Sequence, residues 1–578
     1  MRPDQKIQEH RDHEKSAQGL AVMGYLLLLI PVYLALIYGS FHLPLVADDV
    51  AFSVAASGLW EGQVFLCHPP LYTFLIGLLH KAGFVRENLR LFGAACFIAN
   101  LYLIYAACRA AVRDPGKAWR TGFLAAFLFL INPMAVRGSL ILDIDNTILS
   151  SITLLFVLAF AKLHERPELK TYLILGGLLA LGFWSKLSTP LMLIAAVFIF
   201  YWLKDGFGKS AVRTAATASI GFGAFLITWY VLARLFDLQF FLIFDRAATV
   251  LRTGYDQRAF SLMAELADRI ARTALWAGPF FLLLGALPGL SRITGFFSGN
   301  RSAAGIMDFI SILFAVIFFG YIAVGGVIYG FPKYHYPMLA LAAILAAFHI
   351  ENLGLGFDKK TWPLYAGIIA AWGLYNIKVP GDLIYLVNHE LRRLAILEPL
   401  NLAAGIKNFA ARAGLYLAPA FIAGVFLRLR YKHSFAGTAA LTLLLGSLAA
   451  AGALNLTQAR ADYSTTYLYG RDIGNTERLA ALLMKVKADA PEGLIIAPED
   501  VLYRAGIAET YPYCDWGKTR ELFIQAVSDK NVSCVVYGLT WNSIFQYRTI
   551  FSDPSTLKVL RKSYNESALG EYTVWLRK

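Results

Sequence analysis

Charged side chains are scarce in this chain. Asp, Glu, Lys and Arg make up only 16% of its 578 residues, against about 25% in soluble domains. Hydrophobic residues make up 57%, and the mean hydropathy is +0.54. This balance excludes an ordinary soluble enzyme and predicts a polytopic α-helical membrane protein.

Cysteine is also rare, and its spacing does not suggest a metal site. Residues 1–18 are polar and mixed in charge, and the apolar run that follows is too long for the core of a cleavable signal peptide. The sequence contains no internal repeat and no low-complexity segment. The five cysteines are Cys67, Cys96, Cys108, Cys514 and Cys534.

The net charge of +14 does not require a nucleic-acid partner, because Lys and Arg collect in short loops between apolar runs. This distribution follows the positive-inside rule and also suits anionic lipid headgroups. It predicts that the tail 1–18 and the basic loop 109–120 are cytoplasmic. Only one crossing, 89–108, then fits between the first outer loop and the basic loop 109–120, so the short apolar run 71–79 stays at the outer surface.

The alternation of apolar runs and basic loops predicts about thirteen spans and a C-terminus outside the membrane. We expect a membrane domain over 19–457, with outer loops at 41–88 and 236–273, followed by a soluble α/β domain over 458–578. The expected location is the inner (plasma) membrane. The predicted spans cover 20–40, 89–108, 121–136, 148–163, 172–184, 191–203, 215–235, 274–290, 306–329, 338–350, 364–377, 415–427 and 436–454.

The outer α/β domain has its own pattern of shorter apolar runs. Residues 493–497, 532–537 and 572–576 are predicted to be strands, and 475–487 and 518–527 to be helices. Cys514 and Cys534 both fall in this domain, where they could form a disulfide or remain buried thiols.

The stretch 46–70 follows the first span and carries Asp48, Asp49 and His68. Acidic residues beside a membrane span are costly and usually mark a functional site. Acids and cations on the outer face suit a transfer reaction in which a carboxylate deprotonates an acceptor hydroxyl and cations hold the phosphate of a lipid carrier. The predicted topology places further polar residues there: Asp143, Asp145, Lys186, Arg258, Lys333, Tyr334 and His335.

Structural roles compete with this interpretation. The acid pair in the 46–70 stretch could cap an interfacial helix, although capping accounts for one acid better than for two. Asp143 and Asp145 precede a span that they could cap equally well. Lys186 could extend from a span end to water, and Arg246, Arg252 and Arg258 of the 236–273 loop could line a solvated amphipathic face.

An Asp-Asp pair after the first span, followed by His-Pro-Pro-Leu-Tyr at 68–72, resembles the pattern of GT-C glycosyltransferases. The resemblance is to the branch of protein O-mannosyltransferases and bacterial aminoarabinose transferases of lipid A. It covers residues 20–200 by sequence and the rest by architecture. It implies a soluble outer domain and a polyprenyl- or dolichyl-phosphate sugar as donor.

The resemblance also implies roles for individual residues. Asp48 matches the catalytic base and Asp49 its acidic neighbour, while Asp143 or Asp145 matches an acid that binds the acceptor or shapes the site. Lys-Tyr-His-Tyr-Pro at 333–337 resembles a basic-aromatic motif near the donor phosphate.

The chain departs from the family where the aminoarabinose transferases carry Glu-Lys, because it has Cys67-His68 there. In those enzymes that Glu is a suggested metal ligand, and this chain lacks it. A phosphate contact from His68 would depend on the protonation of its imidazole. The acids could still hold a divalent metal ion, although their spacing does not require one.

Together these observations predict an inverting membrane glycosyltransferase with a lipid, glycan or protein acceptor and with membrane lipids around it. In this hypothesis Asp48 is the base, and the donor phosphate contacts His68, Lys186, Arg258, Lys333, Tyr334 and His335. A transporter or flippase of lipid-linked sugars is an alternative that predicts polar residues deep in several spans and inverted repeats. A non-catalytic assembly factor for cell-envelope glycans is another.

Overall fold

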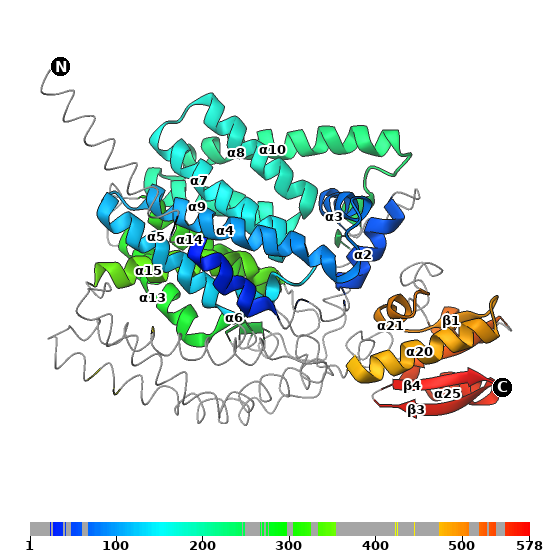
Figure 1. The fold of residues 1–578 in the computed structure, drawn as a ribbon. Coiled ribbons are helices and arrows are strands. Elements are labelled where there is room, and N and C mark those ends of the chain that lie inside the picture. The colour runs from blue at the N-terminus through cyan, green and yellow to red at the C-terminus, as the bar shows by residue number, and fades with distance from the viewer. Residues whose placement is uncertain are drawn as a thin grey trace, which may run out of the picture.

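The protein is mostly helical, with a small sheet near its C-terminus (Figure 1), which confirms the predicted fold class. The structure is a computed structural model. It describes residues 27–38, 48–59, 68–245, 277–297, 305–324, 333–353, 473–507, 520–528, 531–538, 550–570 and 572–578, with isolated positions between these ranges.

Five helical segments within the described ranges are long and apolar enough to cross a membrane. They are α4 (Arg90–Ala111), η3 with α7 (Asp145–Leu149 and Ser150–Glu165), α9 (Ser188–Asp205), α10 (Phe207–Leu235) and α14 (Ile306–Val324). Shorter apolar helices include Leu27–Tyr38, α8 (Leu169–Ser185) and the middle of α13 (Pro279–Phe297). This is a multi-pass membrane protein.

Each predicted span between residues 89 and 350 overlaps a described helix. The predicted spans 364–377, 415–427 and 436–454 lie outside the described residues, apart from isolated positions. The count of thirteen and the direction of each crossing therefore stay predictions.

One predicted span, 121–136, is wrong as a single helix. Asp114 caps α5 (Pro115–Ile131) by accepting hydrogen bonds from the N–H groups of Gly116 and Lys117. Asn132 then begins a separate short helix, α6 (Pro133–Gly138), by accepting from the Ala135 N–H. The break has a physical reason, because proline disfavours helical geometry in the residue before it and fits the first turn of a new helix.

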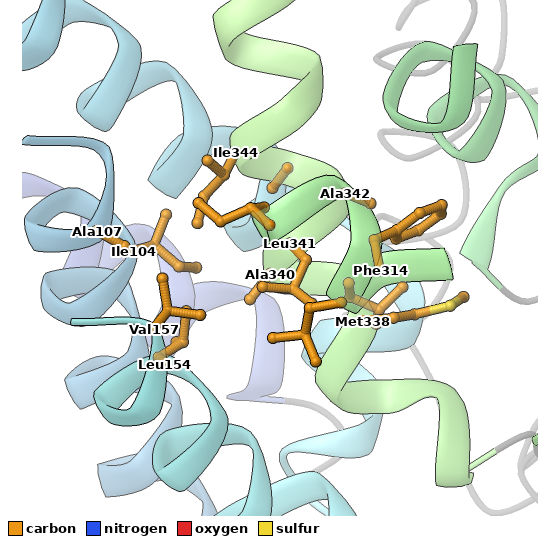
Figure 2. Close-up of a cluster of buried hydrophobic side chains, with 14 of the residues drawn as sticks. Ile104, Ala107, Leu154, Val157, Phe314, Met338, Ala340, Leu341, Ala342 and Ile344 are labelled. Atoms are coloured by element: carbon orange, nitrogen blue, oxygen red, sulfur yellow. The ribbon is translucent and has the colours of Figure 1, made fainter. Parts of the chain in front are cut away.

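Helix α15 (Tyr336–Asn352) lies at the centre of the membrane domain. Nearly all of its residues from Tyr336 to Ala347 are buried on every side, as expected for a helix that is apolar all round. Figure 2 shows Leu341 and Ile344 of this helix near Ile104 of α4 and Val157 of α7, and Met338 near Phe314 of α14. Through α15, the N-terminal helices and α13–α14 share one core.

The run 71–79 forms α3 (Leu71–Lys81), a helix of 11 residues that is about 16 Å long. It is too short to cross a bilayer core of about 30 Å, as the sequence predicted. It packs beside α2 (Asp48–Gly58). Tyr72 and Ile76 of α3 bury themselves in one cluster with Val50 of α2 and with Leu142.

The C-terminal part contains a four-stranded sheet in the order β1-β2-β4-β3. Strand β1 (Leu494–Ile496) is parallel to β2 (Val532–Tyr537), and the other pairs are antiparallel. These two strands and β4 (Tyr572–Arg577) confirm the predicted ones. Helices α20 (Ile473–Asp489) and α22 (Arg520–Ser528) also occur as predicted, together with α21 (Glu499–Arg504) and α25 (Pro554–Ser563).

Strand β3 (Tyr564–Leu569) was not predicted, because it is an edge strand with mostly exposed residues, Tyr-Asn-Glu-Ser-Ala-Leu. It has no apolar run to mark it, and its pairing with β4 alone defines it. Cys534 is a buried free thiol on β2, and Cys514 lies outside the described residues.

Gly93 allows α4 to approach the loop that leads to η3. A Cβ atom at this position would lie 2.1 Å from the carbonyl oxygen of Ser139. We expect Gly93→Ala to destabilise the protein by about 1–3 kcal/mol, the usual cost of overpacking, and to lower its thermal midpoint in detergent. Gly177→Ala in α8 is the matched control, because its Cβ would meet nothing within 4 Å. Equal midpoints for the two variants would contradict this packing argument.

Candidate active site

Asp49 fixes the first turn of α2 to the membrane domain. Its side chain is 2% exposed. Its Oδ1 accepts a hydrogen bond of 2.6 Å from the Leu142 N–H, and its Oδ2 lies 3.4 Å from an Arg90 nitrogen. Asp48 is the first residue of this helix, and its side chain lies outside what the structure describes.

Arg90, at the start of α4, is the cation that neutralises Asp49. It is 4% exposed and also donates to the backbone carbonyls of Leu140 and Phe41, each at 2.9 Å. A buried guanidinium with this many partners ties α2, α4 and the 139–144 loop together. It was not among the predicted site residues, and its only signal was a charge at the predicted outer end of a span, against the positive-inside trend.

Asp143 forms a buried ion pair with Lys333. The Lys333 Nζ lies 2.6 Å from Asp143 Oδ2, and the Asp145 N–H donates to Asp143 Oδ1 at 3.0 Å. Burial raises the pKa of the Asp143 carboxyl, but the ammonium groups of Lys333 and Lys186 outweigh burial, so the pKa lies below its usual value. Asp143 is therefore a carboxylate.

Asp145 forms the second buried pair, with Lys186. The Lys186 Nζ lies 2.6 Å from Asp145 Oδ2 and 3.4 Å from the centroid of the Tyr334 ring. Burial lowers the pKa of Lys186, and the charges of Asp145 and Asp143 oppose this effect without cancelling it. The second carboxylate oxygen, Asp145 Oδ1, is buried without a hydrogen-bond partner among the described residues.

The two ion pairs form one group, because both ammonium groups lie near the Tyr334 ring. Lys333 Nζ is 5.4 Å from the centroid of the same ring. We call Asp143, Asp145, Lys186 and Lys333 the four-charge cluster. Each lysine side chain is only 8% exposed. The cluster thus holds two positive and two negative charges away from bulk water.

Local backbone features present these side chains. Lys186 follows the last residue of α8 in an extended conformation. Lys333 begins the short helix η5 (Lys333–His335), and Pro337 sits in the first turn of α15 directly after it. Asp145 begins η3, a single π-helical turn, and such turns are frequent at functional sites.

The two predicted histidines are neutral. Burial lowers the pKa of His335 to about 4, and its ring lies within 3.4 Å of Thr273 Oγ1 and 3.3 Å of the Phe318 carbonyl. Burial, with Lys186 and Lys333 nearby, lowers the pKa of His68 to about 3. At neutral pH neither imidazole offers a positive charge to a phosphate.

The structure thus brings together most of the residues predicted to form the site. His68 and the four-charge cluster are electrostatic neighbours, and Tyr334 and His335 adjoin them. Tyr72 lies near both Asp49 and Asp143, whose charges, after burial, raise the pKa of its phenol. Arg258 lies outside the described residues.

Arg269 is a second residue near the site that was not predicted. It is buried and donates to the Ile322 carbonyl at 2.7 Å and to the Ala323 carbonyl at 3.2 Å, at the end of α14. Its charge contributes to the low pKa of His335. It belongs to the predicted 236–273 loop, but the prediction considered arginines earlier in that loop.

The described residues contain no group of three or more His, Cys, Asp or Glu side chains that could hold a metal ion. Within the four-charge cluster each carboxylate already faces an ammonium group at 2.6 Å. The arrangement can neutralise and orient an anion near the lysines and can hold a carboxylate ionised near α2.

Breaking the Asp143–Lys333 pair should destabilise the fold. Lys333→Met leaves the Asp143 carboxylate buried beside a neutral side chain, which typically costs about 3–5 kcal/mol. Adding Asp143→Asn should recover much of the lost thermal stability in detergent. Arg213→Met is the control, because the Arg213–Asp205 pair has the same 2.6 Å separation but is 37% and 21% exposed and should matter less. A Lys333→Met protein as stable as the wild type would contradict this account.

His68 should make stability depend on pH. Its pKa in the folded protein, about 3, lies below the usual value of about 6.5. The unfolded chain therefore binds a proton between these values that the folded chain does not, and stability falls as the pH drops below about 6.5. His68→Gln should show a smaller fall in thermal midpoint between about pH 6.5 and pH 4.5. An unchanged slope would show that His68 is not held neutral.

Comparison with known proteins agrees with the architecture. Residues 67–233 match the family model described as dolichyl-phosphate-mannose-protein mannosyltransferase. No curated protein matches the chain. Two crystal structures of ArnT from Cupriavidus metallidurans align with 96% of this chain and 98% of theirs, at 13% identity. The TM-score is 0.56 for ArnT bound to undecaprenyl phosphate and 0.51 for the apo state.

At this level of identity the likeness to ArnT concerns the fold, and the family match concerns the segment that includes His68, Asp143, Asp145 and Lys186. Both findings point to the same group of proteins. The chain has the fold of ArnT over almost its whole length and the mannosyltransferase pattern over 67–233, which confirms its resemblance to the GT-C glycosyltransferases of the protein O-mannosyltransferase and lipid A aminoarabinose transferase branch.

Proposed function

We propose that this protein is a membrane glycosyltransferase that transfers a sugar from a polyprenyl-phosphate carrier to a lipid, glycan or protein acceptor. The reaction takes place at the outer face of the inner membrane, with the N-terminus cytoplasmic and the C-terminal domain outside. The observation that carries the proposal is the pair of buried ammonium groups, Lys186 and Lys333, that both lie near the ring of Tyr334. ArnT, which has this fold, has been crystallised with undecaprenyl phosphate.

The lysines would hold the donor phosphate. The Lys186 ammonium has three N–H groups, and the structure gives one of them to Asp145, so others can turn to a phosphate oxygen. Lys333 adds a second positive charge close by, and burial strengthens both interactions. The neutral imidazole of His68 could donate one hydrogen bond without adding charge. Arg258 is a further candidate for this role.

The two residues of the acid pair, Asp48 and Asp49, have different roles. Asp49 is committed to the Leu142 N–H and to Arg90, so its role is to anchor α2. Asp48, its neighbour in the same turn, is then the general base. Asp143 and Asp145 support the site by keeping the lysines charged and in place.

The chemical step is a single displacement. The acceptor oxygen attacks the anomeric carbon on the side opposite the phosphate, and its proton passes to Asp48. The bond between that carbon and the phosphate oxygen breaks, the electrons leave with the polyprenyl phosphate, and the anomeric configuration inverts. Because phosphate leaves readily, the protein needs orientation and charge stabilisation rather than a strong acid.

A transporter of lipid-linked sugars is the second candidate, since it would also bind a lipid phosphate. Against it, the charges of the four-charge cluster lie at helix ends: before α7, after α8 and before α15. A transport pathway predicts polar groups near the middle of several spans. An assembly factor would bind a partner without turnover, and activity separates it from an enzyme.

Asp48→Asn should lower kcat at least about 100-fold, the usual contribution of a general base. Binding of undecaprenyl phosphate should not change, because that contact belongs to the lysines. Turnover is measured in proteoliposomes as release of undecaprenyl phosphate from a panel of undecaprenyl-phosphate sugars with membrane-extract acceptors. Binding is measured with the purified protein in detergent.

Asp114→Asn is the control for that experiment. Asp114 caps α5, and asparagine caps helices as well as aspartate does, so its turnover should equal that of the wild type. An Asp48→Asn protein with undiminished turnover would remove Asp48 from the mechanism.

A further inference from the structure

The C-terminal domain reaches the helix that carries the acid pair. Helix α21 contacts α2, and the hydroxyl groups of Tyr503 and Ser53 lie 2.9 Å apart. The Tyr503 ring packs against the apolar cluster that contains Val50, Tyr72 and Leu142. The contact therefore combines a hydrogen bond with apolar packing.

The contact with Tyr503 involves the face of α2 that also carries Asp49. Ser53 lies four residues after Asp49, so both point from the same face of the helix. Each is only 2% exposed. The membrane domain thus holds the first turn of this face through Asp49, and the C-terminal domain holds the second turn through Ser53.

The C-terminal domain presents Tyr503 from a well-defined support. Helix α21 is joined to α20 by the ion pair between Arg504 and Glu477. It ends at Arg504, and Gly506, two residues later, has a φ of 69°, a left-handed conformation that suits glycine. The N–H of Gly506 bonds to the Tyr503 carbonyl at 3.0 Å, and the N–H of Ile507 bonds to the Leu502 carbonyl at 2.9 Å. The turn that carries Tyr503 is therefore closed at its C-terminal end.

We propose that Tyr503 is a positioning residue through which the C-terminal domain holds α2, and with it Asp48 and Asp49, in the geometry that catalysis requires. Tyr503 contacts no reacting atom, and it acts only through α2. The effect on turnover rests on the proposed function, whereas the effect on α2 does not. The proposal assigns the C-terminal domain a role in the reaction.

The test combines hydrogen exchange with kinetics on the full-length protein in proteoliposomes. Tyr503→Phe removes the hydroxyl and keeps the ring, and Ser53→Ala removes the other partner. Each should accelerate amide exchange in α2 and lower kcat by about 2- to 10-fold, the range expected for one hydrogen bond. The KM for an undecaprenyl-phosphate sugar should not change, because the phosphate contacts lie elsewhere.

The double variant Tyr503→Phe/Ser53→Ala should be no slower than either single variant, because both remove the same interaction. Tyr572→Phe is the matched control. The Tyr572 hydroxyl bonds to Thr476 at 2.8 Å within the C-terminal domain, so its loss should leave kcat and α2 exchange unchanged. Amide protection in β2 and β4 reports that the domain is folded in every variant.

Two results would overturn the proposal. One is unchanged α2 exchange in Tyr503→Phe and in Tyr503→Ala while β2 and β4 remain protected. The other is a Tyr503→Phe protein whose defect lies in KM with kcat unchanged. If the wild type releases no undecaprenyl phosphate from any sugar donor, the proposed glycosyltransferase function fails, and the exchange data still decide whether Tyr503 holds α2.

Discussion

The burial of four charges in one place is the constraint on which the rest of the site depends. A single carboxylate or ammonium group removed from water carries a penalty of several kcal/mol, and only a well-placed opposite charge offsets it. Asp143 and Lys333 are 190 residues apart in sequence, and Asp145 and Lys186 are 41 apart. Neither pair is stable half-formed, so the segments η3, η5 and the end of α8 must assemble together.

The same need for an opposite charge applies to the acid pair of α2, Asp48 and Asp49. Two adjacent carboxylates on one turn repel each other unless one is neutralised. Arg90 forms an ion pair with Asp49 and the Leu142 N–H donates a hydrogen bond to it, and this makes a negative charge at the preceding residue, Asp48, tolerable. Asp49 is thus both an anchor for α2 and a condition for an ionised Asp48.

Within the described residues, hydropathy predicted the membrane helices well because their length and composition are local properties. It also predicted that α3 is too short to span. The sequence contained the Asn132-Pro133 signal for a helix break, but the apolar run across it hid the break. Strand β3 gave no signal, since its residues are polar and its pairing partner β4 alone determines its structure.

The partners of charged residues could not be predicted in the same way. The predicted topology placed Asp143, Asp145, Lys186 and Lys333 on one face, with separate roles for the acids and the cations. The packing of the helices around α15 determines which ammonium group pairs with which carboxylate, and no local sequence pattern predicts that packing. For the same reason the contact between Tyr503 and Ser53, 450 residues apart, could not be anticipated.

The pairing has a consequence for the proposed reaction. A donor phosphodiester carries one negative charge, whereas the polyprenyl phosphate left after transfer carries about 1.5 to 2 at neutral pH. Lysines without acidic partners would attract the product more strongly than the donor and would slow its release, which limits turnover in many enzymes. Asp143 and Asp145 reduce the positive field that the extra charge experiences. On the proposed function, the acids therefore keep the lysines ionised for the donor and also weaken the hold on the product.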